Sequence, residues 1–368
     1  LGVGVYYDDA GRIPLLKAVR QAETRVFEQA EPRNYLPIDG IPGYNTGARA
    51  LLLGAGSPLI AEHRSLTVQT LGGTGALKVG ADFLKQILPD AKVAISNPSW
   101  ANHQALFATA GFPVVSYDYY DATTHGLDFD GLLASLRALP AGTIVVLHAC
   151  CHNPTGVDPT LDQWREIAST LQVGQLVPFL DIAYQGFGDG IEEDAAVVRL
   201  FASMGMTMFI SSSFSKSFSL YGERVGALTL VTSGDDESTR VLSQLKRVIR
   251  TNYSNPPTHG GSLVSTVLNT PELYALWADE LSGMRDRIRS MRHQLVEKIQ
   301  AHGVDQDFSF VKAQRGMFSY SGLTKPQVER LREDFGIYAV GSGRICVAAL
   351  NSGNIDYVAR AVAEVIKH

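Results

Sequence analysis

The sequence predicts an α/β protein whose mainly parallel sheet is wrapped by helices, and three observations lead to this fold class. The chain has 368 residues, of which 45% are hydrophobic and 19% charged, so it is long enough for a large core and a second domain. Apolar runs typical of strands alternate with segments of helical periodicity. From about residue 280 onward, a long charged amphipathic helix and short elements indicate a smaller second domain.

Several segments are apolar throughout, which is typical of strands covered on both faces of a sheet. The predicted strands are Lys92–Ser96, Val114–Tyr117, Thr143–Ala149, Leu176–Leu180, Met206–Ser211 and Ala227–Val231, and Leu1–Tyr6 is also strand-like. Helical periodicity predicts helices over Gly75–Ile87, Trp100–Ala110, Asp128–Arg137, Thr160–Leu171, Asp194–Met204, Glu280–Ala301 and Val358–Ile366. Asp128 and Asp158 stand just before helical patterns, where we expect a carboxylate to cap the first turn.

Composition and charge exclude several classes of protein. The formal net charge is −5, so we expect neither a nucleic-acid partner nor an anionic membrane surface, and no apolar run is long enough to cross a bilayer. Three cysteines fit a reducing cytoplasm, and the adjacent Cys150 and Cys151 match neither redox nor zinc spacing, so we expect no metal. Leu1 does not begin a signal peptide, and we expect the chain to continue upstream.

Two side chains with catalytic potential follow neighbouring buried strands. Asp181 ends an apolar run, and Lys216 stands in a serine-rich loop after the next run. Ligand sites in parallel sheets lie beyond the carboxyl ends of the strands, so both side chains can reach one crevice. A Lys that forms a Schiff base, with an Asp that pairs a pyridinium nitrogen, is the pattern of pyridoxal phosphate (PLP) chemistry. Taken singly, each residue favours the simpler interpretation, a helix-capping Asp or a solvated surface Lys, because isolated motifs are weak evidence.

A phosphate-binding segment accompanies this pair. Gly72–Gly75 places glycines and a hydroxyl at the start of a helix, where free N–H groups and the helix dipole favour a phosphate. The spacing is neither that of a P-loop nor that of a dinucleotide fingerprint, and a tight turn is the alternative. Ser213, Ser215 and Arg224 add hydroxyl donors and a bidentate phosphate partner around the Lys loop. Arg224 could instead be a surface residue, but it stands between glycines that allow close backbone approach.

Longer motifs occur in a fixed order along the chain. They are Ser96-Asn-Pro-Ser-Trp100, His148-Ala-Cys-Cys-His-Asn153-Pro-Thr-Gly156, Asp181-Ile-Ala-Tyr184, Ser213-Phe-Ser-Lys216, Asn252-Tyr-Ser-Asn-Pro-Pro257 and Ser342-Gly-Arg344. With these motifs the chain resembles, from end to end, the PLP-dependent aspartate and aromatic aminotransferases of class I. Thr70-Leu-Gly-Gly, Phe179-Leu-Asp-Ile-Ala-Tyr and Phe218-Ser-Leu-Tyr-Gly-Glu-Arg make it most similar to the bacterial tyrosine (aromatic) aminotransferases.

The resemblance implies the PLP-dependent transferase fold, with an aspartate aminotransferase-like arrangement of two domains. The large PLP-binding domain would span residues 12–282, and the small α/β domain would combine residues 1–11 with residues 283–368. It also implies a cytoplasmic homodimer of amino-acid biosynthesis, with active sites at the subunit interface and small amino acids and 2-oxo acids as its partners.

The resemblance further assigns roles around the cofactor. Lys216 would hold PLP as a Schiff base and move the substrate α-proton, Asp181 would keep the ring nitrogen protonated, and Tyr184 would donate to the ring oxygen. His148 would orient Asp181 from behind, and His103 would lie beside the ring. The other cofactor-binding residues would be Gly73, Thr74, Trp100, Asn153, Ser213, Ser215, Arg224 and, reaching the neighbouring subunit's phosphate, Tyr35.

The same likeness predicts the substrate contacts. Arg344 would pair with the α-carboxylate, because a planar guanidinium suits a carboxylate better than an ammonium does. Gly4, Asn153 and Trp100 would lie beside it, and Arg250 from the partner subunit would meet the side-chain carboxylate of a dicarboxylic substrate. The predicted activity is transfer of the amino group of tyrosine, phenylalanine and aspartate to 2-oxoglutarate. The alternative is an aspartate aminotransferase with little aromatic activity.

Three other functions compete with this reading. Another PLP reaction, such as decarboxylation or β-elimination, is disfavoured because two arginine clamps suit exchange between amino acids and 2-oxo acids. A transcription regulator with an aminotransferase-like domain would need a DNA-binding module upstream of Leu1. A Rossmann dehydrogenase lacks its glycine fingerprint after the first strand.

Overall fold

A seven-stranded sheet lies at the centre of the larger part of the molecule, in the order β1-β9-β8-β7-β6-β2-β3. The computed structural model describes residues 1–367. Strands β3, β2, β6, β7 and β8 pair in parallel, whereas β9 runs antiparallel to both β8 and β1. The strands are β1 (Ser65–Leu71), β2 (Val93–Asn97), β3 (Val114–Asp118), β6 (Ile144–His148), β7 (Val177–Ile182), β8 (Met208–Ser213) and β9 (Val225–Val231). All six predicted strands of the sheet are confirmed, with small shifts at their ends.

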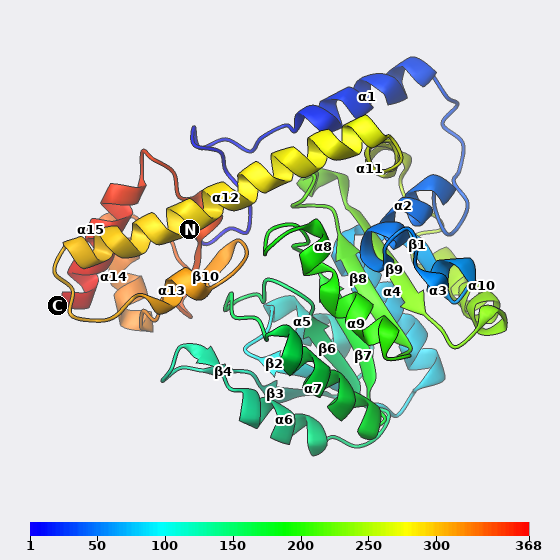
Figure 1. Ribbon diagram of the computed structural model, residues 1–368, viewed down its shortest axis with the longest axis horizontal. Helices are drawn as coiled ribbons and strands as arrows, with labels where there is room; N and C mark the ends of the chain where they lie inside the picture. Colours follow the sequence, from blue (N-terminus) through cyan, green and yellow to red (C-terminus); the bar gives the residue numbers. More distant parts are fainter. Residues whose placement is uncertain (368) are drawn as a thin grey trace.

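Helices cover both faces of this sheet (Figure 1). Along β7, Phe179 belongs to the hydrophobic cluster on one face and Leu180 to the cluster on the other, as the two-residue period of a strand requires. Helices α4, α5 and α10 contribute to the first cluster, and α2, α6, α7 and α9 contribute to the second. The helices of this part are α1 (Lys17–Gln29), α2 (Pro42–Leu53), α3 (Pro58–Ala61), α4 (Gly72–Ile87), α5 (Ala101–Thr109), α6 (Phe129–Arg137), α7 (Leu161–Val173), α8 (Ile191–Asp194), α9 (Ala196–Ser203), α10 (Asp235–Asn252) and α11 (Thr258–Leu268).

One long helix joins the two parts of the molecule. Helix α12 (Pro271–Ala301) runs from α1 and α11 to the smaller part formed by the C-terminal elements (Figure 1). It begins nine residues before the predicted start at Glu280 because buried Leu273 and Trp277 continue its apolar stripe onto the larger part. The predicted domain boundary after residue 282 lies inside this helix, and the two-domain division stays a prediction.

The smaller part consists of short elements packed on the second half of α12. They are α13 (Phe310–Ala313), β10 (Phe318–Tyr320), α14 (Lys325–Phe335), β11 (Arg344–Cys346) and α15 (Ile355–Lys367), while the hairpin β4 (Tyr120–Asp121) and β5 (Gly126–Leu127) extends from the larger part. The strand-like segment at the chain start is not a strand, although the Leu1 carbonyl accepts the N–H of Cys346. Within the described residues, no helix is both long and apolar enough to pass through a bilayer.

Of the two predicted helix caps, one is confirmed and one is wrong, and one predicted helix is interrupted. Asp128 caps α6, where its Oδ1 accepts the N–H of Gly131 at 2.9 Å. Asp158 does not cap α7, because Thr160 takes that position in a reciprocal capping box. Asp158 instead accepts the backbone N–H groups of Cys151 and His152 at 2.7 and 2.8 Å. The helix predicted from Asp194 onward is split, with α8 ending at Asp194 and α9 starting at Ala196.

Candidate active site

A cavity of about 250 Å³ lies at the carboxyl ends of β7 and β8 and at the start of α4. This is where ligands bind in parallel α/β sheets, because the loops that follow the strands converge there. Most of the predicted cofactor residues line it. The lining residues are Gly4, Gly73, Thr74, Leu77, Trp100, His148, Asn153, Asp181, Ala183, Tyr184, Ser213, Ser215, Lys216, Tyr221 and Arg224.

Lys216 and Asp181 face the same cavity from neighbouring strands. Asp181 lies in β7 and Lys216 follows the end of β8, whose register places Asp181 opposite Ser211. The Lys216 Nζ is 4.9 Å from the centre of the Tyr184 ring. Burial lowers the pKa of Lys216 below its usual value, and although Asp181 acts in the opposite direction, the net shift is downward. The amine is therefore a better nucleophile and base than an exposed lysine.

His103 holds the Asp181 carboxylate. Its Nε2 is 3.0 Å from Asp181 Oδ2, and its Nδ1 is 2.9 Å from the Ser99 hydroxyl. Burial alone would raise the pKa of Asp181, but the hydrogen bond from His103 and nearby positive charges outweigh it, so the pKa is lowered. Asp181 is thus an ionised carboxylate inside the pocket, as a partner for a pyridinium nitrogen must be.

This geometry exchanges the predicted roles of the two histidines. His148 does not orient Asp181, because neither of its ring nitrogens has a hydrogen-bond partner among the described residues. It lines the cavity instead, and burial lowers its pKa to about 3, so the ring is neutral. His103 is fully buried and does not line the cavity, which makes it the residue behind Asp181. The expectation for each histidine was therefore wrong.

A chain of hydrogen bonds connects Tyr184 with Arg344. The Asn153 amide donates to the Tyr184 hydroxyl at 3.2 Å, and Arg344 Nη1 donates to Asn153 Oδ1 at 3.1 Å. Arg344 Nη2 donates to the carbonyl of Gly2 at 2.8 Å, and its guanidinium lies 4.4 Å from the centre of the Phe318 ring. The structure therefore places Arg344 beside Asn153, which lines the cavity together with Gly4, whereas Arg344 itself is not among the lining residues.

The opposite end of the cavity has the features of a phosphate cradle. Gly73 and Thr74 begin α4, and Arg224 Nη1 donates to the Ser215 hydroxyl at 3.3 Å. A Cβ on Gly72, which has a φ of +68°, would lie 2.7 Å from Arg224 Nη2. Glycine is therefore required where the guanidinium crosses the helix start. Backbone N–H groups, hydroxyls and a guanidinium converge here, as expected for a dianion.

These residues fit PLP. The cradle suits its phosphate, the ionised Asp181 suits its ring nitrogen, and Lys216 supplies the amine for its aldehyde. His148 also lines the cavity, and neither of its ring nitrogens has a hydrogen-bond partner among the described residues, which is consistent with a polar ligand there.

Besides Arg344, two further predicted site residues lie outside the lining of this cavity. The Tyr35 side chain is 94% exposed, and Arg250 is exposed on α10 with its Nη1 donating to the Ser254 hydroxyl at 2.7 Å. Neither belongs to the lining. Conversely, Tyr221 lines the cavity without having been predicted, and its hydroxyl accepts the N–H of Tyr6 at 2.9 Å. It stands inside the motif that ends at Arg224, which is the signal that could have found it.

Fold and site together define an enzyme of the PLP-dependent transferase fold, and comparisons with known proteins identify the family. The sequence model of the family "aminotransferase class I and II" matches residues 1–362. The chain is 65% identical to an aspartate aminotransferase of Pseudomonas aeruginosa, covering 100% of this chain and 92% of that protein. It is 50% identical to an aromatic-amino-acid aminotransferase of Escherichia coli, with coverage of 100% and 92%.

A solved structure agrees with these relatives. An aromatic-amino-acid aminotransferase from Burkholderia pseudomallei, covalently bound to pyridoxal phosphate, superposes with a TM-score of 0.98 at 65% identity, covering 100% of this chain and 92% of that one. The chain therefore belongs to aminotransferase class I and II, and it is a PLP-dependent aminotransferase. The predicted family, fold class, cofactor and enzyme class are confirmed.

Proposed function

We propose that this aminotransferase exchanges the amino group of tyrosine, phenylalanine and aspartate with 2-oxoglutarate. The observation that carries the proposal is the continuous polar chain from Arg344 through Asn153 to Tyr184, in the same cavity region as Lys216 and Asp181. It places a carboxylate-binding guanidinium next to the groups that would hold the cofactor ring. Relatives named aromatic-amino-acid and tyrosine aminotransferase are both 50% identical to the chain.

The division of labour follows from the geometry. When bound, PLP supplies a ring that accepts the electrons of the substrate Cα–H bond. Lys216 supplies the amine that holds the cofactor and a base at Nζ that moves the α-proton, which its lowered pKa favours. Asp181, held by His103, would keep a positive charge on the ring nitrogen. Tyr184 and Asn153 would bind the ring oxygen, and Trp100 would lie against the ring.

The substrate would be held by its α-carboxylate on Arg344. Asn153 already accepts one N–H of this guanidinium, so the arginine is oriented before the substrate arrives. Gly73, Thr74, Ser213, Ser215 and Arg224 would bind the cofactor phosphate. The cofactor phosphate and the substrate α-carboxylate would then each have their own arginine, with Lys216 lining the same cavity as the phosphate-binding residues.

We also propose that the active enzyme is a cytoplasmic homodimer that serves amino-acid biosynthesis. Tyr35 and Arg250 are exposed side chains with no place in the cavity of their own chain. A second copy would bring its Tyr35 to the phosphate and its Arg250 to the side-chain carboxylate of a dicarboxylic substrate. Sedimentation of the holoenzyme tests this assembly, and a monomer with full activity would contradict it.

One observation favours a second candidate, an aspartate aminotransferase with little aromatic activity. The Pseudomonas aeruginosa relative named aspartate aminotransferase is 65% identical, compared with 50% for the Escherichia coli relative named aromatic-amino-acid aminotransferase. Steady-state kcat/KM with 2-oxoglutarate, measured in parallel for aspartate, tyrosine and phenylalanine, decides between the two. Aromatic values within about a hundredfold of the aspartate value support the first proposal, and a larger deficit supports the second, since about 3 kcal/mol then separates the substrates.

A further inference from the structure

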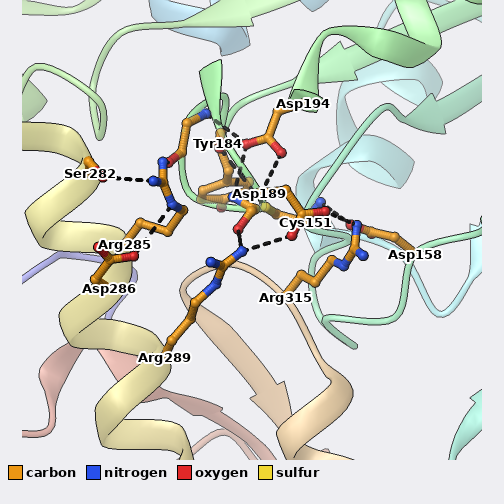
Figure 2. A network of polar contacts seen from close by, with 12 residues as sticks. Cys151, Asp158, Tyr184, Asp189, Asp194, Ser282, Arg285, Asp286, Arg289 and Arg315 are labelled. Carbon is orange, nitrogen blue, oxygen red and sulfur yellow. Dashed lines mark hydrogen bonds and ion pairs between the residues drawn. The ribbon is translucent and has the colours of Figure 1, made fainter. Parts of the chain in front are cut away.

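A second cavity lies on the other side of the loop that carries Asn153. It has a volume of about 700 Å³ and is lined by Cys150, Asp158, Asp194, Gln314 and Arg315, among others. Figure 2 shows Cys151, Asp158 and Asp194 in one network of polar contacts. The side chain of Arg315 and arginine side chains of α12 belong to the same network. None of these cavity residues has a role in the proposed transamination.

Two thiols and a carboxylate converge at this cavity. One ligand atom each of Cys150, Cys151 and Asp194 lies within 4.8 Å of the others, and all three side chains are buried. Two sulfur atoms on one tetrahedral zinc ion, each at about 2.3 Å, are about 3.8 Å apart. Small side-chain rotations therefore suffice to bring these atoms to one ion.

The Asp194 carboxylate has an oxygen lone pair that can bind a metal ion. Its Oδ2 accepts the N–H groups of Gly186 and Gly188, but its Oδ1 accepts only that of Asp189, at 2.9 Å. A carboxylate oxygen has two lone pairs, so Oδ1 retains one. The three hydrogen bonds also fix the carboxylate in place, which reduces the entropy lost when it binds an ion.

A buried positive charge, that of Arg292, lies near this cluster. Arg292 is 2% exposed and donates to the Ser319 hydroxyl and to the carbonyls of Gly316 and Phe318, but no carboxylate pairs with it among residues 1–367. A buried charge without a counter-ion is unfavourable. Two thiolates, one carboxylate and a divalent ion sum to one negative charge, which this guanidinium balances.

The cavity also offers access and a fourth ligand. Cys150 lines it, so an ion entering from solvent meets this thiol first. Gln314 is 4% exposed and lines the same cavity, and its Oε1 has no hydrogen-bond donor among the described residues. A buried acceptor without a donor is rare in proteins, so this oxygen has lone pairs available to a ligand.

We propose that Cys150, Cys151 and Asp194 form a binding site for a soft divalent metal ion of the Zn²⁺ or Cd²⁺ kind, with Gln314 Oε1 or water as the fourth ligand. On binding, the two S–H bonds break, both protons leave to solvent, and two metal–sulfur bonds form without any change of oxidation state. The proposal does not depend on which amino acid the enzyme transaminates.

The site is coupled to the active site through the backbone. The Cys151 thiol donates to the carbonyl of Tyr184 with an Sγ to O distance of 3.9 Å, and Cys151 precedes Asn153 by two residues. A metal ion would remove the thiol proton and so abolish this hydrogen bond. We therefore expect the bound ion to lower transaminase activity by displacing Tyr184 and Asn153.

Titration of the holoenzyme with Cd²⁺ alone, in buffer without thiols, tests the site. The native enzyme is expected to bind one Cd²⁺ per chain, to show the ultraviolet charge-transfer absorption of a cadmium thiolate, and to release about two protons. Cys150→Ser and Cys151→Ser should each abolish this absorption. Cys346→Ser is the matched control, because Cys346 is equally buried but lies outside the cavity, and it should bind as the native enzyme does.

Asp194→Asn tests the carboxylate and should weaken Cd²⁺ binding at least about tenfold, since even outer ligands change metal affinity by that much. A thermal unfolding transition like that of the native enzyme, measured for each variant without metal, confirms that the variant folds. The absence of thiolate absorption in the native enzyme would overturn the proposal. So would equal binding by both cysteine variants, which would place the ion at His103, His148 and Asp181 or at the surface.

Discussion

The pocket around Lys216 and the surface that carries Tyr35 and Arg250 differ in what surrounds their functional side chains. In the pocket, Asp181 is buried and hydrogen-bonded by His103, so its charge is fixed before any ligand binds. At the surface, Tyr35 is 94% exposed and the Arg250 side chain donates a hydrogen bond to Ser254. The pocket is thus preorganised by its own chain, whereas we propose that the surface side chains become ordered against a second subunit.

This contrast has an energetic meaning. A charge held in a buried, hydrogen-bonded position acts strongly because little solvent screens it and no reorganisation is needed. An exposed long side chain gains little until a partner desolvates it. Substitutions in the pocket should therefore affect every substrate, while substitutions at the surface should affect some substrates or depend on assembly.

The largest effect is expected for Lys216→Ala. Loss of the amine that holds the cofactor and moves the proton should lower kcat by about a thousandfold or more for every substrate. Steady-state transamination measures the loss, and borohydride reduction followed by peptide mapping should label Lys216 in the native enzyme. Lys78→Ala is the control, because Lys78 pairs with Asp82 on α4 outside the pocket lining. A label on Lys78 would refute the assignment.

Asp181→Asn comes next. The amide keeps the shape but removes the charge that stabilises a protonated ring, so the deprotonation step should slow about a hundredfold or more while PLP stays bound. Single-turnover kinetics follow this step, and a rate within tenfold of native would show that the ring charge does not depend on Asp181.

The histidines sharpen this test. His103→Phe should reproduce part of the Asp181→Asn defect and make it depend on pH, because loss of the hydrogen bond lets burial raise the pKa of Asp181. The rate should then fall as the pH drops through that raised value. His148→Phe is the matched comparison. An equal pH dependence in that variant would show that His148, as predicted from the sequence, also orients Asp181.

Arg250→Leu should separate the substrates. Removing the partner of a distal carboxylate costs about 3–5 kcal/mol, so kcat/KM for aspartate should fall several hundredfold, whereas that for phenylalanine should fall less than about tenfold. Arg344→Leu should impair both substrates alike, since every amino acid has an α-carboxylate. Equal losses for both substrates in Arg250→Leu would make Arg250 a structural residue.

The smallest effect is expected for Tyr35→Phe. Loss of one hydroxyl on a neighbouring phosphate should weaken PLP retention about tenfold without changing kcat at saturating cofactor. Dialysis followed by cofactor absorbance measures retention. Tyr357→Phe is the control, because Tyr357 is exposed on α15 and donates to the carbonyl of Phe335. Unchanged retention in Tyr35→Phe would mean that no second copy completes the phosphate site.

Much of the molecule follows from sequence alone because its signals are local. Largely apolar runs bounded by turns identified the strands of the sheet, since burial on both faces leaves β6 apolar up to His148 and β9 apolar except for Thr229. Asp181 and Lys216 could be assigned to one crevice because successive parallel strands end at the same edge. The glycines before α4 and around Arg224 were readable because only glycine tolerates the close approach seen at Gly72.

Other features were decided by the tertiary structure. Which histidine meets Asp181 depends on the placement of α5 against β7, between residues 78 positions apart, and no local pattern distinguishes His103 from His148. Asp158 resembled a helix cap in sequence, but the fold turned it toward the N–H groups of Cys151 and His152. The meeting of Cys150 and Cys151 with Asp194 likewise arises only when the loop after β7 packs on the loop after β6. Periodicity reports which face of an element is buried, whereas the partner of a polar atom depends on the packing of distant elements and their side-chain rotamers.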